Sequence, residues 1–238
     1  MSAPDQSGIR NRLLSIMTLD DFELLAPDLE ACDLPKGFVL VEAGRKIDRV
    51  YFPDSGIGSV VATSPEGLKA EVGLFGFDGL CPIAAVMGVR QIAKQEFMQV
   101  AGKGHAISLG AFNTALNASS TLRSLLNAYV YTMVIQAANT ALSNSNHPID
   151  ERLARWILMC DDRTDGMEIA LTHEFISIML SVRRPSVTTA LHVLEGNRFI
   201  STERGTIIIR DRAAMEVFAH DGYGAPETEY RRLIGPMV

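Results

Sequence analysis

A short polar run near the C-terminus has residue types and spacing suited to contacts with DNA bases. Arg183 and Arg184 come directly before Pro185, and Thr189 follows one helical turn later. An arginine guanidinium can donate two hydrogen bonds to O6 and N7 of guanine, and a threonine methyl group can contact the methyl group of thymine. The candidate DNA-contacting residues are Arg183, Arg184, Pro185, Ser186, Thr188, Thr189, His192 and Arg204.

The surrounding pattern predicts two helices that would position these side chains. Residues 172–180 predict a first helix, with Thr172 as its N-cap and apolar residues every three or four positions. A turn follows, in which glycine is the commoner residue and Ser181 is a departure. Pro185 suits the first turn of a second helix because its missing N–H is not needed there. The inward face of this second helix is predicted to consist of Val187, Ala190, Leu191 and Leu194.

A β-hairpin is predicted after the second helix. Gly196 and Asn197 predict a left-handed C-cap. Residues 199–201 and 206–209 are β-rich runs joined by a turn-type sequence. Helix, turn, helix and hairpin in this order predict a winged helix-turn-helix, whose second helix enters the DNA major groove. An unrelated amphipathic helix pair is the alternative, and a hairpin at the right distance argues against it.

The charge of the whole chain at first argues against nucleic-acid binding. The 238 residues have a formal net charge of −6. Residues 171–212, however, contain six arginines against four acidic residues, a local charge of +2. A sequence-specific reader needs a local basic surface rather than a basic chain. We therefore expect specific binding, with weak binding to nonspecific DNA and a preference for low salt.

The cysteines and histidines form no recognisable metal or disulfide pattern. The three cysteines are far apart, their number is odd, and no two of the five histidines have the spacing of a metal motif. We expect no metal, no cofactor and no catalytic activity. No apolar run approaches 18 residues and no secretory signal is visible, so we expect a cytoplasmic protein without a membrane span.

The first 115 residues have a different pattern from the rest. A helix is predicted at residues 18–29, and short β-type runs separated by turn residues follow at near-regular intervals. This spacing is typical of an antiparallel double-sheet barrel. The runs are residues 38–42, 49–53, 57–63, 69–75, 95–100 and 105–108.

Residues 116–145 predict one long helix, and residues 149–162 predict another after a hinge. In the long helix, side chains recur at alternating steps of four and three residues, the spacing of a coiled-coil seam. A helix lying on its own barrel is the alternative. A helix-turn-helix usually binds two half-sites, which favours a dimer. The candidate dimer seam is Leu122, Leu126, Tyr129, Met133, Gln136 and Thr140.

Over nearly its whole length the chain resembles the Crp/Fnr-type transcriptional regulators of the bacterial cyclic-nucleotide-receptor superfamily. Residues 34–52, with Gly44 and Gly56, are similar to the early strands of the family's sensor barrel. Residues 149–158 resemble the helix that opens its DNA-binding domain. The run that begins at Arg183 and continues through the hairpin is the most specific part of the resemblance.

The resemblance is weakest at the family's ligand site. In cyclic-nucleotide-binding members, a glutamate after a glycine meets the ribose hydroxyl, and an arginine before serine or threonine pairs with the cyclic phosphate. Here no carboxylate follows Gly79, and a lysine stands at the arginine position, without the bidentate geometry of a guanidinium. The effector is therefore unknown or absent. Dependence on a cyclic nucleotide, held by Arg90 or Lys94, is the alternative. The degenerate cassette comprises Gly79, Leu80, Cys81, Arg90, Lys94 and Gln95.

The sequence thus predicts an α+β protein with three parts. These are a jelly-roll (double-stranded β-helix) sensor domain over residues 1–116, a dimerisation helix and hinge over residues 117–146, and a C-terminal winged helix-turn-helix domain over residues 147–238. We expect a homodimer that binds a near-palindromic operator in double-stranded DNA, with RNA polymerase as a candidate partner. A cupin-type jelly-roll enzyme is the alternative of another class. It needs clustered histidine and glutamate ligands, and only His105 lies in that region.

Overall fold

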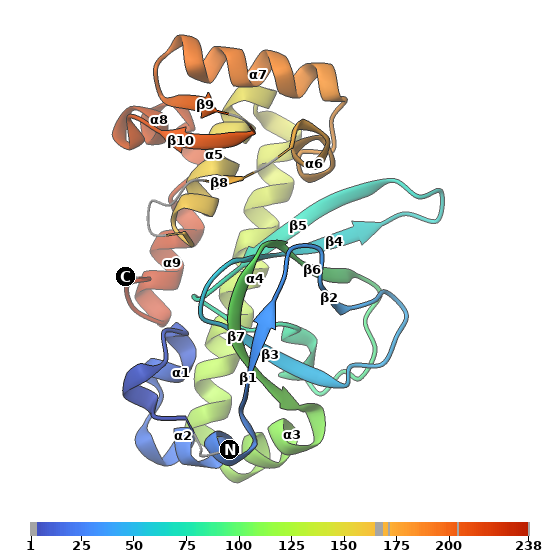
Figure 1. Cartoon of the computed structure of the whole chain (residues 1–238), viewed down its shortest axis with the longest axis vertical. Coiled ribbons are helices and arrows are strands. Elements are labelled where there is room, and N and C mark those ends of the chain that lie inside the picture. Colours follow the sequence, from blue (N-terminus) through green and yellow to red (C-terminus); the bar gives the residue numbers. More distant parts are fainter. Residues whose placement is uncertain (1–3, 165–168, 171, 204, 238) are drawn as a thin grey trace.

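The computed structural model consists of an N-terminal β-sheet domain and a C-terminal, mainly helical domain, connected by a long central helix (Figure 1). It describes residues 4–164, 169–170, 172–203 and 205–237. Helices and strands are both abundant, which confirms the predicted α+β class. No helix among the described residues is long and apolar enough to cross a membrane.

Two short helices precede the sheets. The first, α1 (Arg12–Ile16), was not predicted, and α2 (Leu19–Leu25) begins after the N-cap Thr18. The predicted helix extended to residue 29, but α2 ends at Leu25 and a 3₁₀ turn (Ala26–Asp28) follows. Pro27 lies in this turn, and a proline cannot provide the N–H that a continued α-helix requires.

The N-terminal domain, for which we keep the name sensor domain from the sequence prediction, contains two antiparallel sheets, with strand orders β1-β7-β3 and β2-β6-β4-β5. All six predicted strands are present, and four have the predicted bounds. The sheets enclose a core that includes Phe52 from one sheet and Phe75 and Met98 from the other, although they do not close into a single barrel. The strands are β2 (Val39–Val41), β3 (Arg49–Pro53), β4 (Ile57–Thr63), β5 (Lys69–Phe75), β6 (Gln95–Val100) and β7 (Gly102–Ser108).

An edge strand, β1 (Glu30–Leu34), was missed by the sequence analysis. It pairs with β7 on only one side, and Leu34 is its one fully buried residue. Its sequence, Glu-Ala-Cys-Asp-Leu, lacks the alternation of polar and apolar residues that identifies a strand in a sequence.

The predicted long helix is divided in two at Ser119. Helix α3 (Leu109–Ala118) ends there, and α4 (Ser120–Asn146) begins. Ser119 has extended backbone angles, and its hydroxyl accepts a hydrogen bond from the Leu122 N–H at 3.1 Å. A serine at the N-cap stabilises a new helix start. The N-terminal end of α4 is therefore held at a fixed position against the sensor domain.

Five of the six residues predicted as a dimer seam are buried against the chain's own sensor domain, which corrects the sequence prediction for them. The Gln136 side chain forms two hydrogen bonds with the backbone of Leu74 on β5, at 2.6 and 3.2 Å. Thr140 is half-buried. A four-three repeat shows that one face of a helix is buried, but it does not show whether the covering surface belongs to the same chain. The five fully buried members are Leu122, Leu126, Tyr129, Met133 and Gln136.

The C-terminal domain begins with α5 (Ile149–Asp161), as predicted to within one residue. Its small sheet has the order β8-β10-β9. Two helices that were not predicted complete it, and the second of them, α9, runs back along α4 toward the sensor domain (Figure 1). The remaining elements are β8 (Ile169–Ala170), α6 (His173–Met179), α7 (Arg184–Gly196), β9 (Ile200–Glu203), β10 (Thr206–Ile209), α8 (Arg212–Phe218) and α9 (Ala225–Leu233).

Candidate nucleic-acid interface

The turn between α6 and α7 depends on a residue in the left-handed conformation. Ser181 has a φ of +53°, a value that glycine adopts without steric cost, which explains why glycine is commoner at this position. The N–H of Val182 donates to the Ser177 carbonyl at 2.9 Å and closes the turn. Thr172 caps α6 as predicted, with its hydroxyl accepting from the Phe175 N–H at 3.2 Å. These local contacts fix where α7 starts.

Helix α7 buries one face and exposes the other. The buried residues are the four predicted to point inward, Val187, Ala190, Leu191 and Leu194. They pack in one hydrophobic cluster with α5 and α6. Among the candidate DNA-contacting residues, Ser186 and Thr188 are half-buried. The exposed ones are Arg183, Arg184, Pro185, Thr189 and His192.

Two arginines mark the N-terminal end of α7. Arg183 is its N-cap and Arg184 its first residue, and neither forms an ion pair with another described residue. The N-terminus of a helix carries partial positive charge, so cations there do not stabilise the helix. The fold itself gains nothing from this pair of charges. Both guanidinium groups are available to an anionic partner or to base edges.

The two threonines of α7 have different hydrogen-bond partners. The Thr188 hydroxyl lies 3.2 Å from Nδ1 of His173 on α6. The Thr189 hydroxyl donates to the Pro185 carbonyl at 3.2 Å, within the helix. Thr188 therefore helps to join the two helices, whereas Thr189 remains on the exposed face.

The predicted left-handed C-cap at Gly196 and Asn197 is wrong by one or two residues. Asn197 has right-handed helical angles, and Arg198 has the positive φ, at +62°. The Arg198 N–H donates to the Glu195 carbonyl at 2.9 Å, and the next N–H donates to the Leu194 carbonyl at 3.0 Å. This is the hydrogen-bond pattern of a Schellman cap, with an arginine where glycine is usual. The exposed Arg198 side chain thus lies between α7 and the wing.

The wing, formed by β9 and β10, is bound to α7 by side-chain contacts. Glu195 accepts hydrogen bonds from the backbone N–H of Thr202, at 3.0 Å, and from its hydroxyl. Arg204 lies outside the described residues. Arg212, counted above in the local positive charge, binds Asp161, Asp162 and Tyr223 instead. The basic surface near α7 is therefore smaller than the sequence count indicated.

Comparison with known proteins identifies this arrangement. Solved structures of the same fold include a Crp/Fnr-family regulator from Eubacterium rectale (17% identity, covering 88% of this chain and 98% of that one, TM-score 0.68). FixK2 from Bradyrhizobium japonicum is another (15% identity, 80% and 96% coverage, TM-score 0.67). The model of the Crp-like helix-turn-helix domain family matches residues 151–218, from α5 to α8. Residues 151–218 therefore have the sequence of a Crp-like helix-turn-helix domain, and the chain as a whole has the fold of these Crp/Fnr-family structures. No curated protein sequence matches it.

The degenerate cassette of this chain does not form a common binding site in the structure. Leu80 and Cys81 are buried, whereas Arg90 and Lys94 are exposed and Gln95 is half-buried. The space beside Gly79 is filled, because a Cβ atom added there would lie 1.9 Å from the Tyr129 hydroxyl oxygen. Described residues include no group of three or more metal-ligating side chains.

Two buried carboxyl groups near the cassette were missed by the sequence analysis. Cys81 Sγ lies 2.6 Å from Oε2 of Glu96, and burial raises the pKa of Glu96 to about 7. Burial and the neighbouring Glu96 also raise the pKa of the Cys81 thiol well above its ordinary value, so it is no reactive thiolate. Asp78 pairs with Arg163 of the C-terminal domain. Glu96 could have been found from the sequence, because the alternation of side chains along β6 places it on the inward side. The partner of Asp78 could not, because it lies 85 residues away.

Proposed function

We propose that this protein is a transcriptional regulator of the Crp/Fnr type that binds a near-palindromic operator as a homodimer, with one α7 in the major groove of each half-site. The observation that carries the proposal is the exposed polar face of α7, with two arginines that have no ion-pair partner among the described residues. In a two-fold dimer the half-sites lie about one helical turn apart, roughly 34–36 Å. A DNA-binding role also implies a location in the cytoplasm, with RNA polymerase as a candidate partner.

Arg184 and Thr189 are the residues that we propose to contact bases. They are exposed on the same face of α7, and Arg184 lies at its tip. Arg183 and Arg198 flank the helix and are suited to backbone phosphates, which fix the register of the protein on the duplex. The half-buried Thr188 contributes less, because its hydroxyl already contacts His173.

The exposed face of α4 is the proposed dimer contact, in place of the seam corrected above. Tyr131, Val134 and Leu142 are 48, 54 and 53% exposed. No aspartate, glutamate, lysine or arginine occurs between residues 124 and 148. An exposed apolar stripe along a 27-residue helix, without charges to repel a copy of itself, suits two-fold packing of α4 against α4.

We further propose that DNA binding does not depend on a cyclic nucleotide. The Tyr129 side chain fills the space at Gly79, and the two cations that would substitute for the missing arginine, Arg90 and Lys94, are exposed. Calorimetry with cAMP and cGMP tests this proposal. We expect no measurable binding; a dissociation constant in the low micromolar range would support the cyclic-nucleotide-dependent alternative.

Genomic footprinting followed by titration of the recovered site tests the DNA-binding proposal. We expect nanomolar affinity for one near-palindromic sequence and a steep decrease with salt. Arg184→Ala should weaken binding to that sequence and relax the preference at one base position, whereas Arg231→Ala, a change at an exposed arginine on α9, serves as the matched control. Equal binding of all DNA sequences by the unmodified protein would refute the proposal.

Sedimentation of a double variant tests the dimer. Val134→Asp with Leu142→Asp places two charges in the proposed contact, so we expect monomers that fail to bind the operator. Leu68→Asp is the control, because Leu68 is 73% exposed but lies on the turn between β4 and β5. A double variant that remains dimeric would show that α4 does not form the contact.

A further inference from the structure

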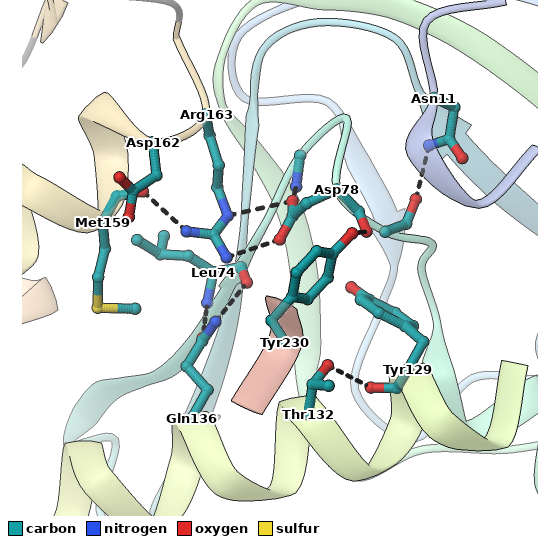
Figure 2. A network of polar contacts seen from close by, with 12 residues as sticks. Asn11, Leu74, Asp78, Tyr129, Thr132, Gln136, Met159, Asp162, Arg163 and Tyr230 are labelled. Atoms are coloured by element: carbon teal, nitrogen blue, oxygen red, sulfur yellow. Dashed lines mark hydrogen bonds and ion pairs between the residues drawn. The ribbon is translucent and has the colours of Figure 1, made fainter. Parts of the chain in front are cut away.

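The two domains are joined by a buried ion pair that lies away from α7. Asp78 belongs to the cassette segment (residues 76–82) of the sensor domain, and Arg163 follows the C-terminal end of α5 (Figure 2). Arg163 Nη2 lies 2.7 Å from Asp78 Oδ2, and Nε lies 3.1 Å from Oδ1. The side chains are 2% and 1% exposed. Two parallel hydrogen bonds fix the orientation of the partners as well as their distance.

Neighbouring groups complete the hydrogen bonding of this pair. The Gly76 N–H donates to Asp78 Oδ1 at 2.7 Å, and Arg163 Nη1 donates to the Met159 carbonyl at 2.8 Å. The Tyr230 hydroxyl, on α9, donates to the Asp78 carbonyl at 2.6 Å (Figure 2). A buried charge is tolerated only when such partners are present. If one domain slid along the other, both charges would stay buried but would lose these hydrogen-bond partners.

Helix α5 connects this pair to the DNA-binding surface. Arg163 follows its C-terminal end, and near its other end Arg152 donates a hydrogen bond to the Leu180 carbonyl, beside the turn that leads into α7. Between these contacts, Leu153 and Ile157 are fully buried in the cluster that also holds the inward face of α7. The position of Arg163 therefore determines the position of α7 through one packed helix.

A second contact crosses the same boundary. The indole N–H of Trp156 on α5 donates to Glu71 Oε1 on β5 at 2.7 Å. Ile57, Val61 and Leu74 of the sensor strands also belong to the hydrophobic cluster of the C-terminal domain. With the domains held in this way, α7 lies at one end of the molecule and its polar face is uncovered (Figure 1).

We propose that Asp78 and Arg163 are positioning residues that hold the DNA-binding domain in its DNA-ready orientation without a bound ligand. The cassette segment thus binds an arginine of its own chain. This inference rests on the proposed function of α7 and adds the contact that sets its position.

The test compares operator binding by the unmodified protein, Asp78→Asn, Arg163→Met and the double variant. Each single change leaves one buried charge without its partner, and the double change removes both charges. We expect each single variant to bind the operator at least tenfold more weakly. The double variant should lose less than the product of the two losses, because the two groups act as a pair. Glu30→Gln, which breaks the exposed ion pair with Arg49, is the control and should bind normally.

Amide hydrogen exchange without DNA measures the domain contact independently. We expect faster exchange in residues 76–82 and 225–233 of both single variants, and no change in Glu30→Gln. Arg163→Lys keeps the positive charge but loses the two parallel hydrogen bonds, so we expect a smaller loss of operator binding. It replaces the other variants in the test if they do not fold. Normal or tighter operator binding by variants with faster exchange would overturn the inference. If the unmodified protein binds no operator, the proposed function is wrong. The exchange data then still show whether the pair joins the domains.

Discussion

Two arginines at the start of α7 and two near the C-terminal end of α5 have the same chemistry but different surroundings. Arg183 and Arg184 are exposed and form no ion pair with described residues. Arg163 is 2% exposed and paired with Asp78, and Arg212 on α8 binds four side chains, among them Asp161 and Asp162 at the same end of α5. Burial alone would lower the pKa of Arg163, but the neighbouring Asp78 and Asp162 carboxylates raise it above its ordinary value. One pair remains available to a partner, while the other is part of the fold.

This difference separates two ways in which an arginine can serve a DNA-binding protein. An exposed arginine affects folding little and changes the binding of DNA directly. A buried, paired arginine changes binding only through the structure that it holds. Variants of the two kinds should therefore differ in which measurement they alter, and the following predictions test that separation.

The largest expected effect is on folding stability. Arg163→Ala leaves Asp78 buried without its partner, and removal of one member of a buried pair costs about 3–5 kcal/mol. Arg184→Ala should change the free energy of unfolding by no more than about 0.5 kcal/mol. Denaturant unfolding of both variants measures the difference. If both variants lose the same free energy of unfolding, the distinction between the exposed and the buried arginines is wrong.

A pH effect of similar size is expected from Glu71, at the same domain boundary. Burial raises the pKa of this carboxyl group from 4.5 to about 7, against the hydrogen bonds from Ser59 and Trp156 and the charges of Arg155 and Arg163. The folded state then binds a proton that the unfolded state releases between about pH 4.5 and 7. For this group, stability is greatest below pH 4.5 and falls as pH rises through 7.

The shift in Glu71 corresponds to roughly 3 kcal/mol at most. Glu71→Gln should remove this decrease, so the stability of the variant relative to the unmodified protein should increase from pH 5 to pH 8. Denaturant unfolding across that range gives the measurement. Glu66→Gln is the control, because Glu66 is exposed. A difference that does not depend on pH would show that Glu71 is already ionised at pH 5.

A smaller effect, on specificity, is expected from Arg184. Arg184→Ala should cost about 1–3 kcal/mol of operator binding at a single base pair, as the loss of a bidentate contact does. Titration against operators substituted at each position locates the contact. The same loss on every sequence would make Arg184 a phosphate contact instead.

The smallest effect is expected from Thr189→Ala. Loss of one methyl contact with a thymine should weaken binding by about 1 kcal/mol or less and relax the preference at a neighbouring base pair. The same set of substituted operators measures it. Unchanged discrimination at every position would exclude Thr189 from base contact.

Local features of this chain could be predicted from the sequence with good accuracy. The bounds of β3, β4, β5 and β6 and the inward face of α7 were predicted correctly. These features depend on the alternation of polar and apolar side chains along a strand, or on their recurrence along a helix, and a single segment contains that information. The N-cap Thr172 acts over three residues and was equally visible, whereas the C-cap of α7 was predicted one or two residues too early.

Features that depend on a distant segment could not be predicted in the same way. The spacing along α4 showed that one face is buried, but only the tertiary structure showed that the sensor domain covers it. The pairing of Asp78 with Arg163 joins residues 85 positions apart, and neither has a local pattern that specifies the other. The sequence by itself determined most of the helices and strands and which face of α7 is polar, because those preferences are local. Tertiary structure decided which helix face meets which domain and which arginines remain exposed, because burial and ion pairing depend on what the folded chain brings together.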